Sequence, residues 1–236
     1  MLNFIDHKKM GRGRHDWLDS HFHFSFAEYC NPQNVQFGAL RVLNDDEVQP
    51  KEGFGTHPHK DMEIISYVVD GQLTHADSMG NRRSLTRGQV QYMSAGTGVT
   101  HSELNMGDGL LRFLQIWIFP DRAGYEPNYG DMRFDWDDRI NRWMPIASGS
   151  EESPGIFRIH ADANVYASLL EKGRTAEIAV NPDRQAYLVL IEGRAQANGI
   201  GLEARDALEI IGENVSVSAV QDAHMLLVEM ENKQGA

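Results

Sequence analysis

The chain has 236 residues, of which 41% are hydrophobic and 24% are charged. This length fits one large or two modest domains, and the composition excludes a disordered, collagen-like or coiled-coil chain. Because 34 acidic residues outnumber 22 basic residues and give a formal charge of −12, the surface repels nucleic acids and anionic lipids, and we expect neither as a direct partner.

Short β-rich runs alternate with turn residues between about residues 35 and 120. The runs cover residues 37–43, 63–69, 89–93 and 111–119, and Asn, Asp and Gly mark the turns between them. This rhythm is typical of an all-β sandwich or barrel. We therefore predict a first β-domain over residues 1–135.

Residues 121–155 contain several prolines and little alternation, which predicts a linker with a short strand. Beyond it, a helix is predicted over residues 165–170, and short β-rich runs return until residue 230. The turns at residues 70–72 and 192–194 begin similar spacings of glycines and strands, which indicates a degenerate internal repeat. We therefore predict a second β-domain over residues 136–236.

Two features of the chain bear on its compartment. No apolar stretch approaches the roughly 20 residues that a membrane-spanning helix needs, and residues 1–9 lack the apolar run of a secretory signal. Cys30 is the one cysteine, so no intramolecular disulfide can form. We therefore expect a reducing, cytoplasmic environment.

Two pairs of residues carry the candidate chemistry. His57 and His59 are two residues apart in a predicted strand, so their side chains lie on one face. His101 and Glu103 repeat this spacing after a Gly-rich turn. Neighbouring strands of one barrel could bring both pairs together around one metal ion. The alternative is that His57 and His59 are ordinary polar strand residues that face solvent.

Three imidazoles and a carboxylate, without a thiolate, suit iron(II), manganese, nickel, copper or zinc, and the ligand types alone do not select among these ions. Four protein ligands in an octahedral shell leave two positions open for water, substrate or dioxygen. A closed tetrahedral structural site leaves none. The pattern therefore favours an enzyme over a structural metal site.

The spacing around these residues resembles the two cupin motifs, which are matched by His57, His59, Glu63, Gly71, Gly98, His101 and Asn105. Further stretches resemble the pirins, a bicupin family, at residues 17–20, 24–26, 40–46, 77–81 and 93–96. The resemblance covers about residues 11–120. One departure is Phe22, which stands where pirins have a histidine.

The resemblance to pirins implies an all-β fold of two tandem cupin domains, each a jelly-roll β-barrel, with one metal ion in the first. It implies that the ligands are His57, His59, His101 and Glu103. Iron(II) is the ion that we expect, with zinc, manganese, nickel, copper and cobalt as alternatives. Simple counting gives Glu63 the same strand parity as the two histidines, so it remains a rival fourth ligand.

The resemblance also implies quercetin 2,3-dioxygenase activity, in which dioxygen opens the central ring of a flavonol and carbon monoxide leaves. The metal would stabilise the anion of the flavonol 3-oxygen, and Glu103 would accept the 3-hydroxyl proton. Four residues are candidates to line a slot for the flat aromatic substrate: Phe54, Met62, Met93 and Trp117. The alternative is that these four are core residues.

Two alternatives to this activity remain open. Pirins are also known as transcriptional cofactors, so the resemblance also allows an iron-dependent, redox-sensing regulatory protein that binds a protein partner. A cupin isomerase or a hydrolase of another small molecule is the third possibility, because a fold does not determine its chemistry.

The other histidines receive no ligand role in this interpretation. His21 and His23 alternate with an apolar strand face, and we interpret them as structural. His75 and His160 each precede an aspartate by two residues, as in a pair that sets a tautomer, and we assign them no function. Because only His224 lies near a ligand position of the second domain, we expect no metal site there.

Overall fold

The structure, a computed structural model, describes residues 1–150 and 156–232. It is almost entirely β, as predicted, and forms two compact units. The N-terminal unit consists of Gly11–Phe134 and Ile159–Ala161, and the C-terminal unit consists of Met1–Met10, Asp135–Arg158 and Asp162–Ala236. The last residues of the expected linker, 151–155, lie outside the described residues. No helix in the described ranges has the length and apolar character to cross a membrane.

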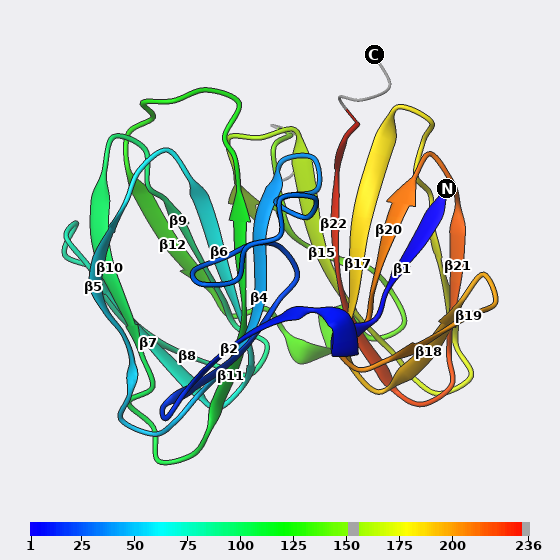
Figure 1. Cartoon of the computed structure of the whole chain (residues 1–236), viewed down its shortest axis with the longest axis horizontal. Coiled ribbons are helices and arrows are strands. Elements are labelled where there is room, and N and C mark those ends of the chain that lie inside the picture. The colour runs from blue at the N-terminus through cyan, green and yellow to red at the C-terminus, as the bar shows by residue number, and fades with distance from the viewer. Residues whose placement is uncertain (151–155, 233–236) are drawn as a thin grey trace. The chain divides into compact units, whose positions relative to one another are not determined.

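The N-terminal unit contains two antiparallel sheets that face each other (Figure 1). The larger sheet has the strand order β12-β9-β6-β11-β4-β3-β2. Its strands are β2 (Gly11–His15), β3 (Leu18–Phe22), β4 (Leu40–Val48), β6 (Glu63–Asp70), β9 (Val90–Ser94), β11 (Leu111–Ile118) and β12 (Asn128–Met132). The smaller sheet has the order β5-β10-β7-β8 and consists of β5 (Gly53–His59), β7 (Gln72–Asp77), β8 (Arg82–Thr86) and β10 (Val99–Leu104).

Apolar side chains close one end of this barrel. Val68, Leu73, Leu111 and Phe113 pack there in one cluster with Leu18, and each is buried. The interior strand β6 is buried from its first residue to Val69, which explains why most of its residues are apolar. The interior of the barrel away from this cluster is where polar side chains gather.

Strands β5 and β10 approach each other closely at Gly53. A Cβ at this position would lie 2.4 Å from the carbonyl oxygen of Glu103, and the φ angle of Gly53 is +148°. Glycine adopts this backbone conformation without the steric cost that other residues incur. Gly53 therefore permits the β5–β10 pairing on which the histidine positions depend.

The C-terminal unit repeats the two-sheet plan. One sheet has the order β1-β20-β17-β22-β15-β13-β14 and the other β16-β21-β18-β19. The strands are β1 (Leu2–Ile5), β13 (Met144–Ser148), β14 (Phe157–Arg158), β15 (Ala163–Leu170), β16 (Thr175–Ile178), β17 (Arg184–Glu192), β18 (Arg194–Ala197), β19 (Ile200–Glu203), β20 (Ala207–Ile211), β21 (Val215–Ala219) and β22 (Ala223–Glu231). Two short 3-10 helices, η1 (His7–Lys9) and η2 (Trp136–Arg139), also belong to this unit.

Three sequence expectations differ from the structure. The first ten residues belong to the C-terminal unit rather than to the first domain, because β1 pairs with β20. The helix predicted over residues 165–170 is wrong: these residues lie in β15, which pairs with β13 and β22. The expected linker contains two strands, β12 and β13, rather than one. In the second case pairing on both sides outweighs the weak local preference for a helix.

Replacing Gly53 with Ala should lower the free energy of unfolding by about 2–3 kcal/mol, because the new methyl group meets the backbone of β10. Gly55→Ala is the matched control, since nothing lies within 4 Å of a Cβ there, and its effect should stay within about 0.5 kcal/mol. Urea denaturation of both metal-free variants measures the difference. Equal destabilisation by the two substitutions would contradict the role of Gly53.

Candidate metal centre

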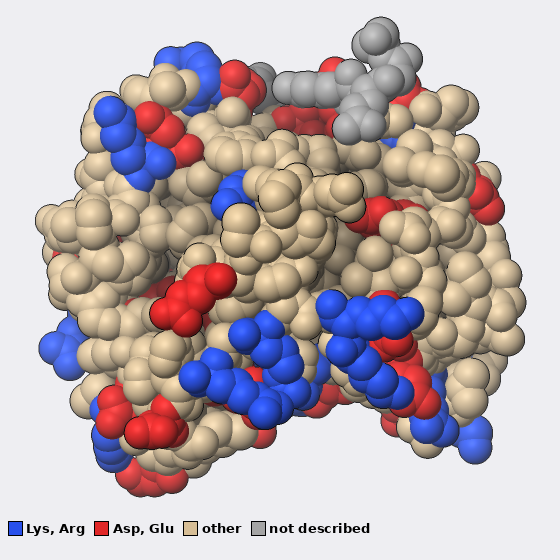
Figure 2. All heavy atoms as spheres, in the orientation of Figure 1, with Lys and Arg blue, Asp and Glu red and all other residues tan. Residues whose placement is uncertain are grey.

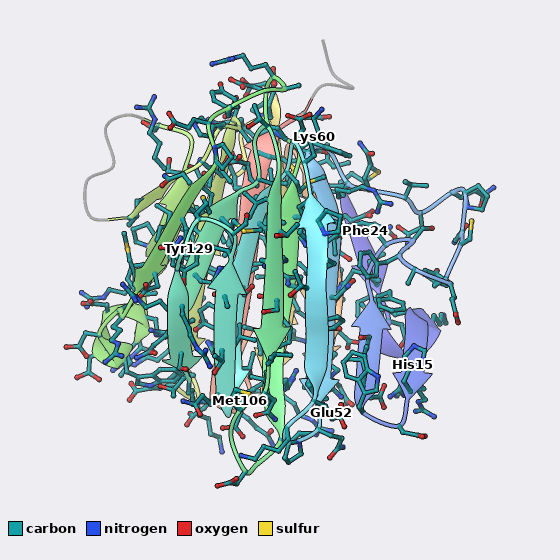
Figure 3. The ribbon with its side chains drawn as sticks, turned by 90° about the vertical axis from the view of Figure 1, so that its left-hand side faces the viewer. His15, Phe24, Glu52, Lys60, Met106 and Tyr129 are labelled. Atoms are coloured by element: carbon teal, nitrogen blue, oxygen red, sulfur yellow. The ribbon has the colours of Figure 1, made fainter. Side chains whose placement is uncertain are left out.

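Three histidines converge on one point inside the N-terminal barrel. His101 on β10 pairs directly with His57 on β5, and Val99 pairs with His59. Figure 3 shows β5 beside β10, with Glu52 and Lys60 marking the ends of β5. The three ring centroids are 4.6 to 4.8 Å apart, and one nitrogen from each ring lies within 4.8 Å of the others. The spacing expected from the sequence therefore does bring these three side chains together.

The protonation of these rings suits metal binding. Burial lowers the pKa of His59 to about 4 and that of His101 to about 3, with a contribution from the neighbouring imidazoles. Nδ1 of His57 lies 2.7 Å from the carbonyl oxygen of Gly55, which assigns the proton to Nδ1 and leaves Nε2 as a free donor atom. His59 and His101 are therefore neutral at pH 7, the form in which histidine coordinates a metal.

His101 gives the clearest sign that a ligand belongs here. Its side chain is buried, and neither ring nitrogen has a hydrogen-bond partner among the described residues. Buried polar atoms normally have a partner, because leaving one unpaired costs about 1–3 kcal/mol. A metal ion between the three rings would supply that partner, so the donor set fits a divalent cation.

Glu103 is held in the wall of the same space by three side-chain donors. Ser66 Oγ and Gln91 Nε2 each donate to Oε1 at 2.6 Å, and Gln115 Nε2 donates to Oε2. One extra residue of β5 shifts the pairing between His101 and Glu103, so that Glu103 faces Phe54. Glu103 is thus close to the histidines without belonging to the tight group of three.

Sequence reasoning missed Ser66, Gln91 and Gln115. Each is a buried polar residue on a strand that is otherwise mainly apolar, namely β6, β9 and β11. An isolated polar residue within a mainly apolar run could have indicated these three positions, because a buried polar group needs a hydrogen-bond partner.

Glu63 points to a different set of partners. Tyr92 Oη donates to its carboxylate at 2.5 Å, Ser94 Oγ at 2.6 Å and the His160 backbone N–H at 3.0 Å. The parity count from His59 failed because residues 60–62 form a turn between β5 and β6, with Asp61 at a φ of +48°. The alternation of side chains along β6 therefore does not continue that of β5.

A hollow of about 340 Å³ lies beside the histidines. Aromatic side chains form much of its wall, and the Trp117 ring lies 4.8 Å from the His59 ring, edge to face. Of the four expected slot residues, Phe54 and Trp117 line the hollow. Met62 and Met93 instead pack in a core cluster with Ile64 and Val99.

The remaining histidines have structural partners. His75 Nε2 lies 2.9 Å from Asp77 Oδ2, and its ring lies 5.4 Å from that of His101. His160 does not pair with the aspartate two residues later; it contacts Glu63 and stacks on Tyr125 at 3.7 Å. His21 and His23 are both buried, and burial lowers the pKa of His23 to about 3.

The C-terminal unit presents a different interior. Aliphatic side chains fill it, including Leu188, Leu190, Val215 and Val217, where the first barrel has polar residues. His224 Nδ1 lies 3.0 Å from Glu192. Three possible ligands that the sequence analysis did not single out, Asp6, His7 and Asp206, also lie close together. Asp206 already accepts hydrogen bonds from the ring and backbone of His7 and from the backbone of Glu203.

Comparison with known proteins places this fold and site in a family. The pirin family model matches residues 5–118, and a model described as the quercetinase C-terminal cupin domain matches residues 146–230. A pirin-like protein of Caulobacter vibrioides is 43% identical, covering 95% of this chain and 99% of that protein. A quercetin 2,3-dioxygenase of Escherichia coli is 38% identical, covering 93% of this chain and 94% of that protein.

Solved structures agree with the sequence relatives. The bacterial pirin YhhW of Escherichia coli, solved in complex with nickel(II), superposes with a TM-score of 0.92 at 36% identity. The match covers 98% of this chain and 99% of that one. Both cupin domains are therefore accounted for, and the chain belongs to the pirin family.

Proposed function

We propose that this chain is a metal-dependent dioxygenase that opens the central ring of flavonols such as quercetin and releases carbon monoxide. The observation that carries the proposal is the group of three convergent histidines beside an aromatic-lined hollow. Relatives that cover nearly the whole chain bear the name quercetin 2,3-dioxygenase, which supports the same substrate class.

In this proposal His57, His59 and His101 hold the metal through ring nitrogens, and Glu103 is the fourth ligand. The bound ion supplies Lewis acidity at the flavonol 3-oxygen and a path for electrons to dioxygen. Iron(II) is our proposed ion, and the nickel(II) complex of the Escherichia coli pirin supports a divalent cation of this type.

Glu103 is also the proposed general base. A carboxylate offers about four lone-pair sites, and Ser66, Gln91 and Gln115 occupy three of them. One site is left for the metal or for the 3-hydroxyl proton of the substrate. The three donors fix the orientation of the carboxylate, which is what proton transfer needs.

The aromatic wall has a separate part in the proposal. Trp17, Phe54 and Trp117 line the hollow and provide apolar faces for a flat ring system. Packing against these faces excludes water from the reacting carbon atoms and orients the ring toward the histidines. Substrate binding then depends on the hollow, and proton transfer on Glu103.

Metal content and turnover should depend together on the histidines. Anaerobically purified protein should contain about one metal ion per chain and consume dioxygen when quercetin is added, with release of carbon monoxide. The double variant His57→Ala, His59→Ala should lose both, because two of the four ligands are removed. Elemental analysis and an oxygen electrode measure the two quantities.

His224→Ala is the control for this experiment, since it removes a histidine of the C-terminal unit. We expect it to keep the metal. Loss of one equivalent from this variant would contradict a metal-free second domain. One bound iron without oxygen uptake in the unaltered protein would overturn the dioxygenase proposal and leave a metal-dependent regulatory protein.

Glu103→Gln should reduce metal affinity and slow flavonol turnover by about 10²–10⁴-fold, the usual contribution of a general base. Glu63→Gln is the matched variant, because it alters the other buried glutamate of the same barrel. Turnover of Glu63→Gln should stay within a few-fold of the unaltered protein. The reverse pattern would make Glu63 the ligand, and full activity of Glu103→Gln would remove Glu103 from both roles.

A further inference from the structure

A second hollow adjoins the first within the N-terminal unit. Its volume is about 640 Å³, against about 340 Å³ for the hollow beside the histidines. The two hollows share five lining residues, which are Trp17, Phe26, Asn44, Asp46 and Phe54. A ligand that fills the first hollow therefore meets the second across this shared wall.

The shared wall has a polar part on β4. Asn44 and Asp46 are two residues apart, so they face the same side of the strand, and both are buried. Ser20 Oγ donates a hydrogen bond to Asp46. Asn44 Oδ1 is buried and has no hydrogen-bond partner among the described residues. A hydroxyl group of a ligand would supply the missing donor.

The far end of the second hollow has balanced charges. Arg12 and Arg14 line it, and both lie near Asp19, at 2.6 and 3.5 Å. Glu28 lies in the same lining. Figure 2 shows Lys and Arg in blue and Asp and Glu in red on one face of the molecule. An anionic group would find no excess of positive charge here.

Aromatic rings give the second hollow its apolar surface. Trp17 packs edge-on against Phe54 at 5.2 Å, and Phe22 stacks with Tyr29 at 6.4 Å. Such rings provide flat surfaces on which the C–H faces of a sugar ring can pack, while neighbouring polar groups bond to its hydroxyls. A wholly apolar group would instead leave Asn44 Oδ1 without a donor.

We propose that the second hollow binds an uncharged, hydroxyl-rich substituent, such as a glycosyl group, carried by the aromatic substrate whose reacting ring lies beside the histidines. This inference rests on the proposed function and extends it from flavonols to flavonols substituted away from the 3-hydroxyl. The metal and the general base keep their roles, and the second hollow selects among substrates.

Calorimetric titration of the metal-loaded protein without dioxygen tests the inference. The probes are quercetin, its 7-O-glucoside and its 7-O-sulfate. The glucoside should bind at least as tightly as quercetin, and the sulfate about tenfold more weakly than the glucoside, since the far end lacks excess positive charge. Exclusion of the glucoside while quercetin binds would overturn the inference and leave the proposed function intact. Binding of neither flavonol would overturn both.

A variant that narrows the second hollow tests where the substituent binds. Glu28 is exposed and lines the second hollow but not the first, so Glu28→Trp should weaken glucoside binding at least tenfold and change quercetin binding less than twofold. Gln33→Trp is the control, at an exposed position of the same connection between β3 and β4 that lines neither hollow. Equal weakening of both ligands by Glu28→Trp, or sulfate binding as tight as glucoside binding, would contradict the assignment.

Discussion

The antiparallel pairing of β5 with β10 is the constraint on which the site depends. It sets His57 opposite His101 and brings His59 alongside them, although the two strands are about 40 residues apart in the chain. Gly53 permits the close approach at one end of the pair. The extra residue of β5 shifts the pairing register between His101 and Glu103. Glu103 therefore pairs with Phe54 and does not continue the alternation that brings the histidines together. Side chains placed on paired strands have little freedom to move, which favours a preformed site for the proposed metal ion.

The interiors of the two units differ in polarity. In the C-terminal unit aliphatic side chains fill the space between the sheets, and burial of that surface stabilises the barrel. In the N-terminal unit part of the same space holds histidines, a glutamate and two glutamines, which gives up hydrophobic stabilisation at those positions. Such a loss is tolerable because every oxygen of Glu103 has a donor and the apolar cluster at one end of the barrel remains.

Period-two reasoning predicted which histidines converge, because the side-chain alternation within one strand is a local property. It failed for Glu63, since the turn after His59 starts a new alternation. It also failed for residues 165–170, where pairing with two strands decides the structure. The donors to Glu103 come from three other strands, β6, β9 and β11, so no spacing rule within one strand could connect them. Local patterns therefore predict which histidines converge better than they predict the groups that hold Glu103.

The contrast between the two buried glutamates of one barrel follows from their partners. Glu63 accepts hydrogen bonds from two hydroxyls and a backbone N–H, and His160 covers it from the remaining side. It has thereby become part of the framework that holds residues 159–161 against this unit. Glu103 accepts from three side chains, and its remaining lone pair borders the hollow beside the histidines. The proposed function assigns the chemistry to the carboxylate that has fewer hydrogen-bond partners, and burial alone would not have distinguished the two.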